Sequence, residues 1–212
     1  MKKGIIFDMD GTLWDSADGV AKSWTEVVNQ EYDKERVITT EDIQNVMGRT
    51  MDKIAEIIFP NLDEKARLEL MNHCCMYENE YLREHGGILF PHLEETLKIL
   101  KEKYHLYIVS NCQSGYIEAF LEHYGFGHYF DDIECYGNNL FQKGENIRLV
   151  VERNELTKAV YVGDIQGDYD ATMEAGLPFI HAAYGFGTIA QETAKINSFA
   201  ELPKVAEEIL GE

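Results

Sequence analysis

Residues 4–12 read GIIFDMDGT, and this stretch decides the fold. Its first four residues form an uninterrupted apolar run rich in strand-forming side chains, and Asp8 ends that run. Apolar residues at every position are typical of a strand that is buried on both faces of a parallel sheet. In open parallel sheets, ligands bind beyond the carboxyl ends of the strands. The stretch therefore predicts a buried strand with two carboxylates, Asp8 and Asp10, at a ligand-binding edge.

The rest of the chain repeats this pattern. Three further apolar runs cover residues 106–109, 159–162 and 178–180. Strands that alternate with helices are typical of an α/β fold with a parallel sheet, and this is the fold class that we predict. Segments with helical periodicity lie between the runs, at about residues 93–103, 116–124, 145–153 and 168–175.

Residues 15–86 depart from this alternation. They contain no convincing buried strand, only amphipathic segments with helical periodicity. We expect a small α-helical domain inserted after the first strand, so that residues 1–14 and 87–212 together form the core. The predicted helices of the insertion cover about residues 19–32, 40–46, 51–58 and 63–84.

The composition is that of an acidic globular protein. Hydrophobic residues make up 45% of the 212 residues, which is enough for a packed core. The formal net charge of −19 repels nucleic-acid phosphates and anionic lipid, so we expect neither nucleic acid nor a membrane as a partner. The first residues contain only a short apolar run, and the four cysteines show no CxxC spacing. Both observations predict a cytoplasmic location; the sequence does not indicate an oligomeric state.

Polar side chains follow three of the predicted strands. Asp8 and Asp10 follow the first, Ser110 and Asn111 the second, and Asp164 the third. Carboxylates gathered in a crevice repel one another and are costly to desolvate, so a purely structural role does not explain them. A hard divalent cation removes this cost, and a site with few carboxylates and open positions suits Mg²⁺.

The loop after the first strand has a catalytic and a simpler interpretation. In the catalytic one, one aspartate is a nucleophile and the other acts as general acid and then base. Gly11 allows a tight turn, and we expect the backbone N–H groups of this loop, at Gly11 and Thr12, to face an anion. In the simpler interpretation, the segment is an Asp-Gly turn with two solvated acids.

Two charged residues extend the candidate site. Asp168 opens a helix one turn after Asp164, and we expect a metal near both, with Asp164 as the direct ligand; alternatively, Asp168 only interacts with the helix dipole. Lys143 comes just before a helix, where it is either a solvated lysine or a cation that offsets phosphoryl charge in the crevice. The hydroxyl of Ser110 and the amide of Asn111 would bind phosphate oxygens, or simply form turns.

Together these residues resemble the motifs of the haloacid dehalogenase-like hydrolase superfamily. The resemblance spans nearly the whole chain. It implies a Rossmann-like core with an α-helical cap inserted after the first motif. The matching positions, in order, are Asp8-Met9-Asp10-Gly11-Thr12, Ser110, Lys143, and Gly163-Asp164 with Asp168.

The resemblance also implies roles for these residues. Asp8 would be the nucleophile that becomes a phosphoaspartate, and Asp10 would protonate the leaving alcohol and later activate water. Mg²⁺ would be held by Asp8, the backbone carbonyl of Asp10 and Asp164, with Asp168 in support. Phosphoryl oxygens would be bound by Ser110, Asn111 and Lys143. The implied activity is Mg²⁺-dependent hydrolysis of a small phosphorylated metabolite.

Features within the superfamily favour a phosphatase. Dehalogenases of the superfamily lack the second aspartate of the first motif, which this chain has as Asp10. The stretches at residues 15–18 and 87–91 resemble the phosphoglycolate-phosphatase-like branch, although His92 stands where that branch commonly has glycine. The related β-phosphoglucomutases usually place a histidine near Val20, so mutase-like phosphoryl transfer is the alternative.

Other interpretations remain open from the sequence. Arg49, after Gly48 in a turn of the inserted domain, would reach a distal anionic group of the substrate, or would be an ordinary surface arginine. A phospho-acceptor signalling module also combines acids, Ser/Thr and Lys around Mg²⁺, but it has no helical cap and no need for Asp10. A silent sugar-phosphate-binding protein would normally have lost one of the acids or Lys143. The sequence does not name the substrate.

Overall fold

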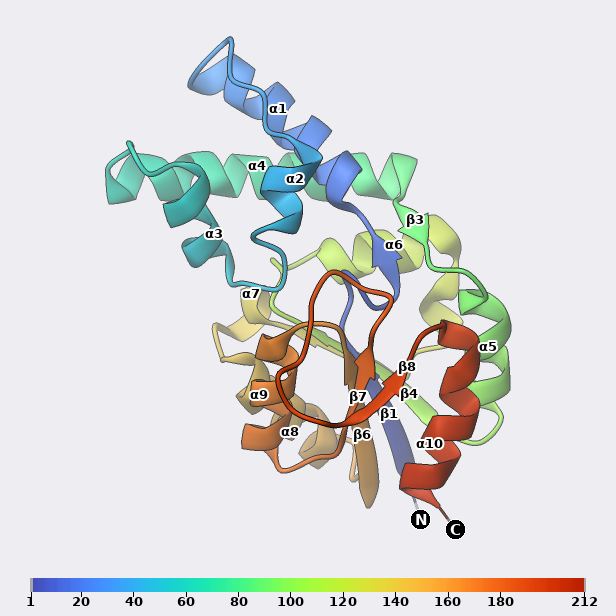
Figure 1. Cartoon of the computed structure of the whole chain (residues 1–212). Helices are drawn as coiled ribbons and strands as arrows, with labels where there is room; N and C mark the ends of the chain where they lie inside the picture. Colours follow the sequence, from blue (N-terminus) through green and yellow to red (C-terminus); the bar gives the residue numbers. More distant parts are fainter. Residues whose placement is uncertain (1, 212) are drawn as a thin grey trace.

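A six-stranded parallel sheet forms the centre of the core (Figure 1). The computed structural model describes residues 2–211. The strands stand in the order β5-β4-β1-β6-β7-β8, which confirms the predicted α/β fold class. Their bounds are β1 Lys3–Phe7, β4 His105–Ser110, β5 Asp132–Cys135, β6 Lys158–Gly163, β7 Phe179–Ala182 and β8 Ala194–Ile196.

Helices cover both faces of the sheet, because alternate strand residues point to opposite sides. Ile5 and Phe7 of β1 pack into one hydrophobic cluster with α5 and α10, whereas Ile6 packs into a second cluster with α8. Figure 1 shows α5 and α10 on one side of the sheet and α8 and α9 on the other. The core helices are α5 Leu93–Lys101, α6 Tyr116–Tyr124, α7 Tyr136–Asn139, α8 Lys143–Arg153, α9 Gln166–Ala175 and α10 Leu202–Leu210, with 3₁₀ turns at Phe126–His128 and Phe199–Glu201.

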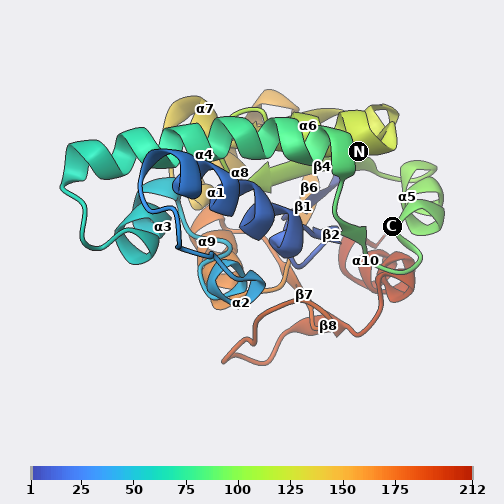
Figure 2. The ribbon, with the colours of Figure 1, turned by 90° about the horizontal axis from the view of Figure 1, so that it is seen from above.

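The inserted helices form a cap above the carboxyl ends of the strands (Figure 1). Seen from above, α1 and α4 lie side by side across the top of the molecule (Figure 2). The chain enters and leaves the cap through a two-stranded antiparallel pair, in which Trp14 faces Leu89 and Asp15 faces Ile88. The elements of this region are β2 Trp14–Asp15, α1 Ala17–Glu31, α2 Thr40–Gln44, α3 Met51–Ile58, α4 Glu64–His85 and β3 Ile88–Leu89.

Hydrogen bonds on two sides of the cap help to fix it on the core. Asn79 of α4 donates a hydrogen bond from Nδ2 to the carbonyl of Ser114, over 2.9 Å. On the other side of the cap, the loop between α2 and α3 meets the core, where Asn111 Nδ2 donates to the carbonyl of Gly48 over 2.8 Å. The cap therefore lies directly over the ends of β1 and β4. Among the helices in residues 2–211, none combines the length and apolar character needed to cross a membrane.

Candidate active site

Three adjacent strands place acidic and polar side chains at one edge of the sheet. Asp8 directly follows β1, Ser110 is the last residue of β4, and Asp164 directly follows β6. Since β4 and β6 pair with β1 from its two sides, the three side chains end up close together. All three are buried. The chain thus adds strands first on one side of β1 and then on its other side, so the strand order reverses at β1. In open α/β sheets, ligands bind at such a switch point.

The loop after β1 is held tightly by its own backbone. Gly11 has φ +80°, and a side chain there would overlap the carboxylate of Asp164, so glycine is required. We expected the N–H groups of Gly11 and Thr12 to face an anion, but they donate to the carbonyls of Trp14 and Met9 within the loop. Within residues 2–211, the N–H groups of Met9 and Asp10 have no acceptor. Those two are therefore the groups of this loop that are available to an anion.

Lys143 is the cation at this edge and is not a solvated lysine. It is the first residue of α8, and its side chain is buried. Its Nζ lies 2.8 Å from Asp8 Oδ1 and 2.6 Å from Asp168 Oδ1. Burial alone would lower the pKa of Lys143, but the charges of Asp168 and Asp8 raise it well above its ordinary value. Lys143 therefore stays positive and holds Asp8 in place.

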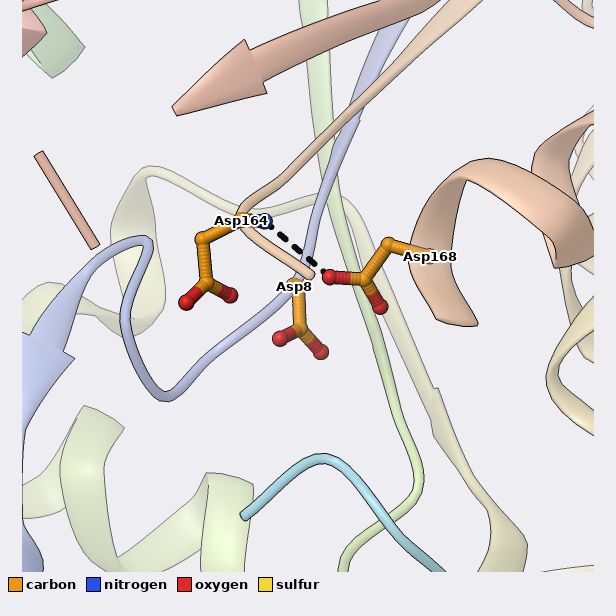
Figure 3. A group of neighbouring side chains, drawn as sticks. All are labelled: Asp8, Asp164 and Asp168. Atoms are coloured by element: carbon orange, nitrogen blue, oxygen red, sulfur yellow. Dashed lines mark hydrogen bonds between the residues drawn. The ribbon is translucent and has the colours of Figure 1, made fainter. Parts of the chain in front are cut away.

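Asp8, Asp164 and Asp168 form a candidate metal centre (Figure 3). One oxygen from each lies within 4.8 Å of the others. Burial and the charge of Asp168 raise the pKa of Asp8 to about 7, and burial also raises that of Asp164. Three buried carboxylates with a single lysine leave negative charge uncompensated, and a divalent cation would compensate it.

The hydrogen bonds show which oxygens are free for such a cation. Asp168 is already engaged, since Oδ1 pairs with Lys143 and Oδ2 accepts the N–H groups of Asp164 and Ile165. Asp164 accepts the Phe186 N–H at Oδ2, over 2.7 Å, whereas its buried Oδ1 has no partner within the described residues. An unpartnered oxygen of this kind, next to Asp8, fits a hard cation that takes oxygen ligands.

Asp10 lies in a different environment from Asp8. Its Oδ1 accepts hydrogen bonds from Ser16 Oγ and from Tyr116 OH, each over 2.7 Å. Burial raises the pKa of Asp10 to about 6, although these two hydroxyls oppose the shift. Oδ1 is therefore fixed by protein donors, and Oδ2 is the oxygen that remains for a proton exchanged with a ligand. The sequence motif did not indicate Ser16 or Tyr116.

Other predicted site residues lie around a small cavity between this edge and the cap. Asn111 lines the cavity, and its Oδ1 is buried without a partner within residues 2–211. Ser110 lines it from the core, and the exposed Arg49 from the α2–α3 loop. The side chain of Arg49 forms no ion pair with the described residues. The distal role that we predicted for it stays a prediction.

The cap contributes a buried acid that the sequence did not single out. Glu78, in the middle of α4, is 3% exposed and lines the same cavity as Asp10. Its Oε2 accepts the Trp24 Nε1–H of α1 over 2.5 Å. In the sequence, Glu78 does not differ from Glu80 and Glu84 of the same helix, which are both exposed. Only the packing of α1 on α4 identifies it.

Known proteins are similar to this chain in sequence and in fold. Residues 5–182 match the family model described as haloacid dehalogenase-like hydrolase. Phosphoglycolate phosphatase of Shigella boydii serotype 4 is 28% identical over 213 aligned residues, which cover 87% of this chain and 82% of that protein. Phosphoglycolate phosphatase of Aliivibrio fischeri is 27% identical over 201 residues, covering 87% and 85%.

Solved structures show the same architecture. A haloacid dehalogenase-like family hydrolase from Streptococcus pneumoniae superposes with a TM-score of 0.81 at 22% identity, over 96% of this chain and 97% of that one. A structure described as a predicted phosphatase, from Clostridium acetobutylicum, superposes with a TM-score of 0.77 at 24% identity, over the whole of both chains. At these identities the likeness concerns the fold.

Proposed function

This chain belongs to the haloacid dehalogenase-like hydrolase family, and on that basis we propose that it is a Mg²⁺-dependent phosphatase, which hydrolyses a small phosphate monoester through a phosphoaspartate on Asp8. The relatives named phosphoglycolate phosphatase support a phosphate monoester as substrate. The observation that carries the proposal is the arrangement at the sheet edge. Asp8 is paired with Lys143 beside the unpartnered Asp164 Oδ1, and Asp10 stands nearby with one oxygen free.

Asp8 and Asp10 divide the chemistry between them. An oxygen of the Asp8 carboxylate attacks phosphorus, and the bond between phosphorus and the alcohol oxygen breaks. Asp10 gives its proton to that oxygen. The ionised Asp10 then removes a proton from water, whose oxygen attacks the phosphoaspartate, releases inorganic phosphate and restores Asp8.

The surroundings of the two acids fit these roles. Ser16 and Tyr116 hold Oδ1 of Asp10, so the carboxyl group is oriented before the substrate arrives. Lys143 and the N–H groups of Met9 and Asp10 offer positive charge and donors to the phosphoryl oxygens.

The metal would be held by Asp8, Asp164 and the backbone carbonyl of Asp10, with Asp168 orienting Lys143 and the loop around Asp164. When bound, Mg²⁺ supplies positive charge beside the phosphoryl oxygens. The cap over the site would exclude water and select the leaving group.

Phosphate release from para-nitrophenyl phosphate, with and without Mg²⁺, tests the proposal. We expect Asp8→Asn to abolish Mg²⁺-dependent release and Asp10→Asn to lower it by at least about 100-fold, the usual contribution of general acid–base catalysis. Asp18→Asn is the matched control, since Asp18 is exposed and, within residues 2–211, its one ion pair is with Lys22.

Three outcomes would contradict the proposal. Near-normal release by Asp8→Asn or Asp10→Asn would remove the role assigned to that residue. Conversion of a sugar phosphate to an isomer without release of inorganic phosphate would favour a mutase, although Val20 stands where a mutase histidine would be expected. A stable phosphoprotein without turnover would favour a signalling function.

A further inference from the structure

The cavity above Asp10 is small and lies between the core and the cap. Its volume is about 40 Å³, and a water molecule needs roughly 10–15 Å³ on this measure, so about three non-hydrogen atoms fit. Asp10 stands on the core side, and apolar side chains from the cap make up most of the opposite wall. These wall residues are Val20, Trp24, Ile43, Val46, Met47 and Ile54.

Three polar side chains around this cavity, one from the cap and two from the core, offer hydrogen-bond acceptors. Glu78 contributes a carboxyl group held by Trp24. Gln113 lines the cavity as well, and its Oε1 is buried without a partner within residues 2–211, as is Oδ1 of Asn111. Buried acceptors that lack a protein donor are costly unless a ligand supplies one.

Two buried donors beside the cavity are already in use. Tyr116 OH donates to Asp10, and Trp24 Nε1–H donates to Glu78. The remaining cation that lines the cavity is Arg49, which lies on the exposed side of the α2–α3 loop. The Ser110 hydroxyl and the amide N–H groups of Asn111 and Gln113 also line the cavity. The buried side-chain atoms of this lining that lack a protein partner within residues 2–211 are the two amide oxygens, which a donor on the ligand would satisfy.

Glu78 and Asp10 also feel each other's charge. Burial raises the pKa of Glu78 to about 8, and the charge of Asp10 contributes to the same shift. The two carboxyl groups line the same cavity. A third carboxylate between them would be desolvated beside two acids.

From these contacts we propose that the leaving group carries a hydrogen-bond donor, a hydroxyl or an ammonium group, and no carboxylate, with Glu78 as the residue that selects it. This inference rests on the proposed phosphatase activity and names its substrate class. It sets the chain apart from relatives whose name indicates phosphoglycolate, a carboxylate-bearing substrate.

A series of two-carbon phosphate esters tests the inference on the wild-type protein. Ethyl phosphate, 2-hydroxyethyl phosphate, 2-aminoethyl phosphate and 2-phosphoglycolate present the same phosphate and differ in the group at the second carbon. We expect kcat/KM for the hydroxyl or ammonium ester to exceed that for phosphoglycolate by at least about tenfold, because unpaired buried polar groups discriminate strongly. The ethyl ester should lie between them. The better of the two donor esters then identifies the donor.

Glu78→Gln tests the residue itself. Glutamine keeps an oxygen for Trp24 Nε1–H but cannot ionise. At pH 9, above the Glu78 pKa of about 8, we therefore expect the ratio of kcat/KM for phosphoglycolate to that for the best donor ester to rise at least about fivefold. Glu80→Gln is the matched control. Glu80 lies two residues further along α4 and is exposed, so its substitution should leave the ratio unchanged.

The outcomes separate this inference from the proposed function. If none of the four esters nor para-nitrophenyl phosphate is hydrolysed, the proposed function fails. If phosphoglycolate is the best of the four, the inference fails while the phosphatase activity stands, and Arg49→Gln would then show whether Arg49 binds the carboxylate. An unchanged ratio in Glu78→Gln would remove Glu78 as the selecting residue.

Discussion

At the scale of single residues, the buried acids of the sheet edge differ from the buried acid of the cap. At the sheet edge, Lys143 lies between Asp8 and Asp168, so charge is partly compensated there. In the cap, Glu78 has a neutral partner, the indole of Trp24, and no ion pair within the described residues. The edge acids directly follow predicted strands, so their positions in the sequence were enough to find them. The sequence did not reveal Glu78, because the local sequence of a charged helix does not distinguish a buried glutamate from an exposed one.

The state of Glu78 makes stability depend on pH. Its pKa is about 8 in the folded protein against an ordinary value of 4.5, so between these values the folded state holds a proton that the unfolded state has lost. The contribution of Glu78 to the free energy of unfolding is therefore largest below pH 4.5 and is lost as the pH rises toward 8. Relative to Glu78→Gln, we expect the wild-type free energy of unfolding to fall by about 1.4 kcal/mol per pH unit in this window.

Urea denaturation of both proteins at pH 5.5 and pH 7.5 measures this change. The difference between wild type and Glu78→Gln should shift by about 2 to 3 kcal/mol between the two pH values, against the wild type at the higher one. The difference between wild type and Glu80→Gln should stay constant. A constant difference for Glu78→Gln as well would mean that Glu78 is ionised in the folded protein.

At the scale of elements, the four central strands of the six-stranded sheet and most helices followed from the sequence, but the two edge strands of that sheet and the short pair β2 and β3 did not. β5 and β8 stand at the two edges of the sheet and contain charged residues, such as Asp132 and Lys195. Edge strands need not be apolar at every position, so the pattern that reveals central strands misses them. The contact between the α2–α3 loop and the core could not be predicted from the sequence either, because it depends on how the cap packs on the core.

That contact leads to a prediction for Gly48. Its φ is +80°, its carbonyl accepts the Asn111 amide, and a side chain there would press on Ile165. A left-handed backbone costs other residues roughly 1–2 kcal/mol. We therefore expect Gly48→Ala to loosen the loop and to lower kcat/KM by about fivefold or more.

Gly125→Ala is the control for Gly48→Ala, and steady-state kinetics with para-nitrophenyl phosphate compares the two variants. Gly125 also has a positive φ, of 69°, at the end of α6, but nothing lies near its missing side chain. Its substitution carries a similar backbone cost away from the cap. Equal losses of activity in both variants would show that seating of the α2–α3 loop does not govern turnover.

At the scale of the whole molecule, the acidic character and the buried carboxylates act together. The formal net charge is −19, and the candidate metal centre adds like charges that must be desolvated on folding. The protein is therefore less stable without a cation than its packed core would allow. A cation that binds only the folded state shifts the folding equilibrium in proportion to its occupancy.

We expect Mg²⁺ to raise the melting temperature by about 5–10 °C at a hundredfold excess over its Kd, which corresponds to about 2.7 kcal/mol for a protein of this size. Differential scanning calorimetry at constant ionic strength measures the shift. Asp164→Asn should largely remove it, because Asp164 carries the unpartnered oxygen. Asp170→Asn, an exposed acid on α9, should keep it. An equal shift in both variants would point to general screening of the negative surface.

The two segments that connect the cap with the core, β2 and β3, affect how such a protein can change in evolution. Because β2 and β3 pair with each other, the chain leaves and re-enters the core at neighbouring points. An inserted segment of another length or composition would leave the pairing of β4, β1 and β6 unchanged. Substitutions in the cap can therefore change which groups face the cavity without moving the acids at the sheet edge.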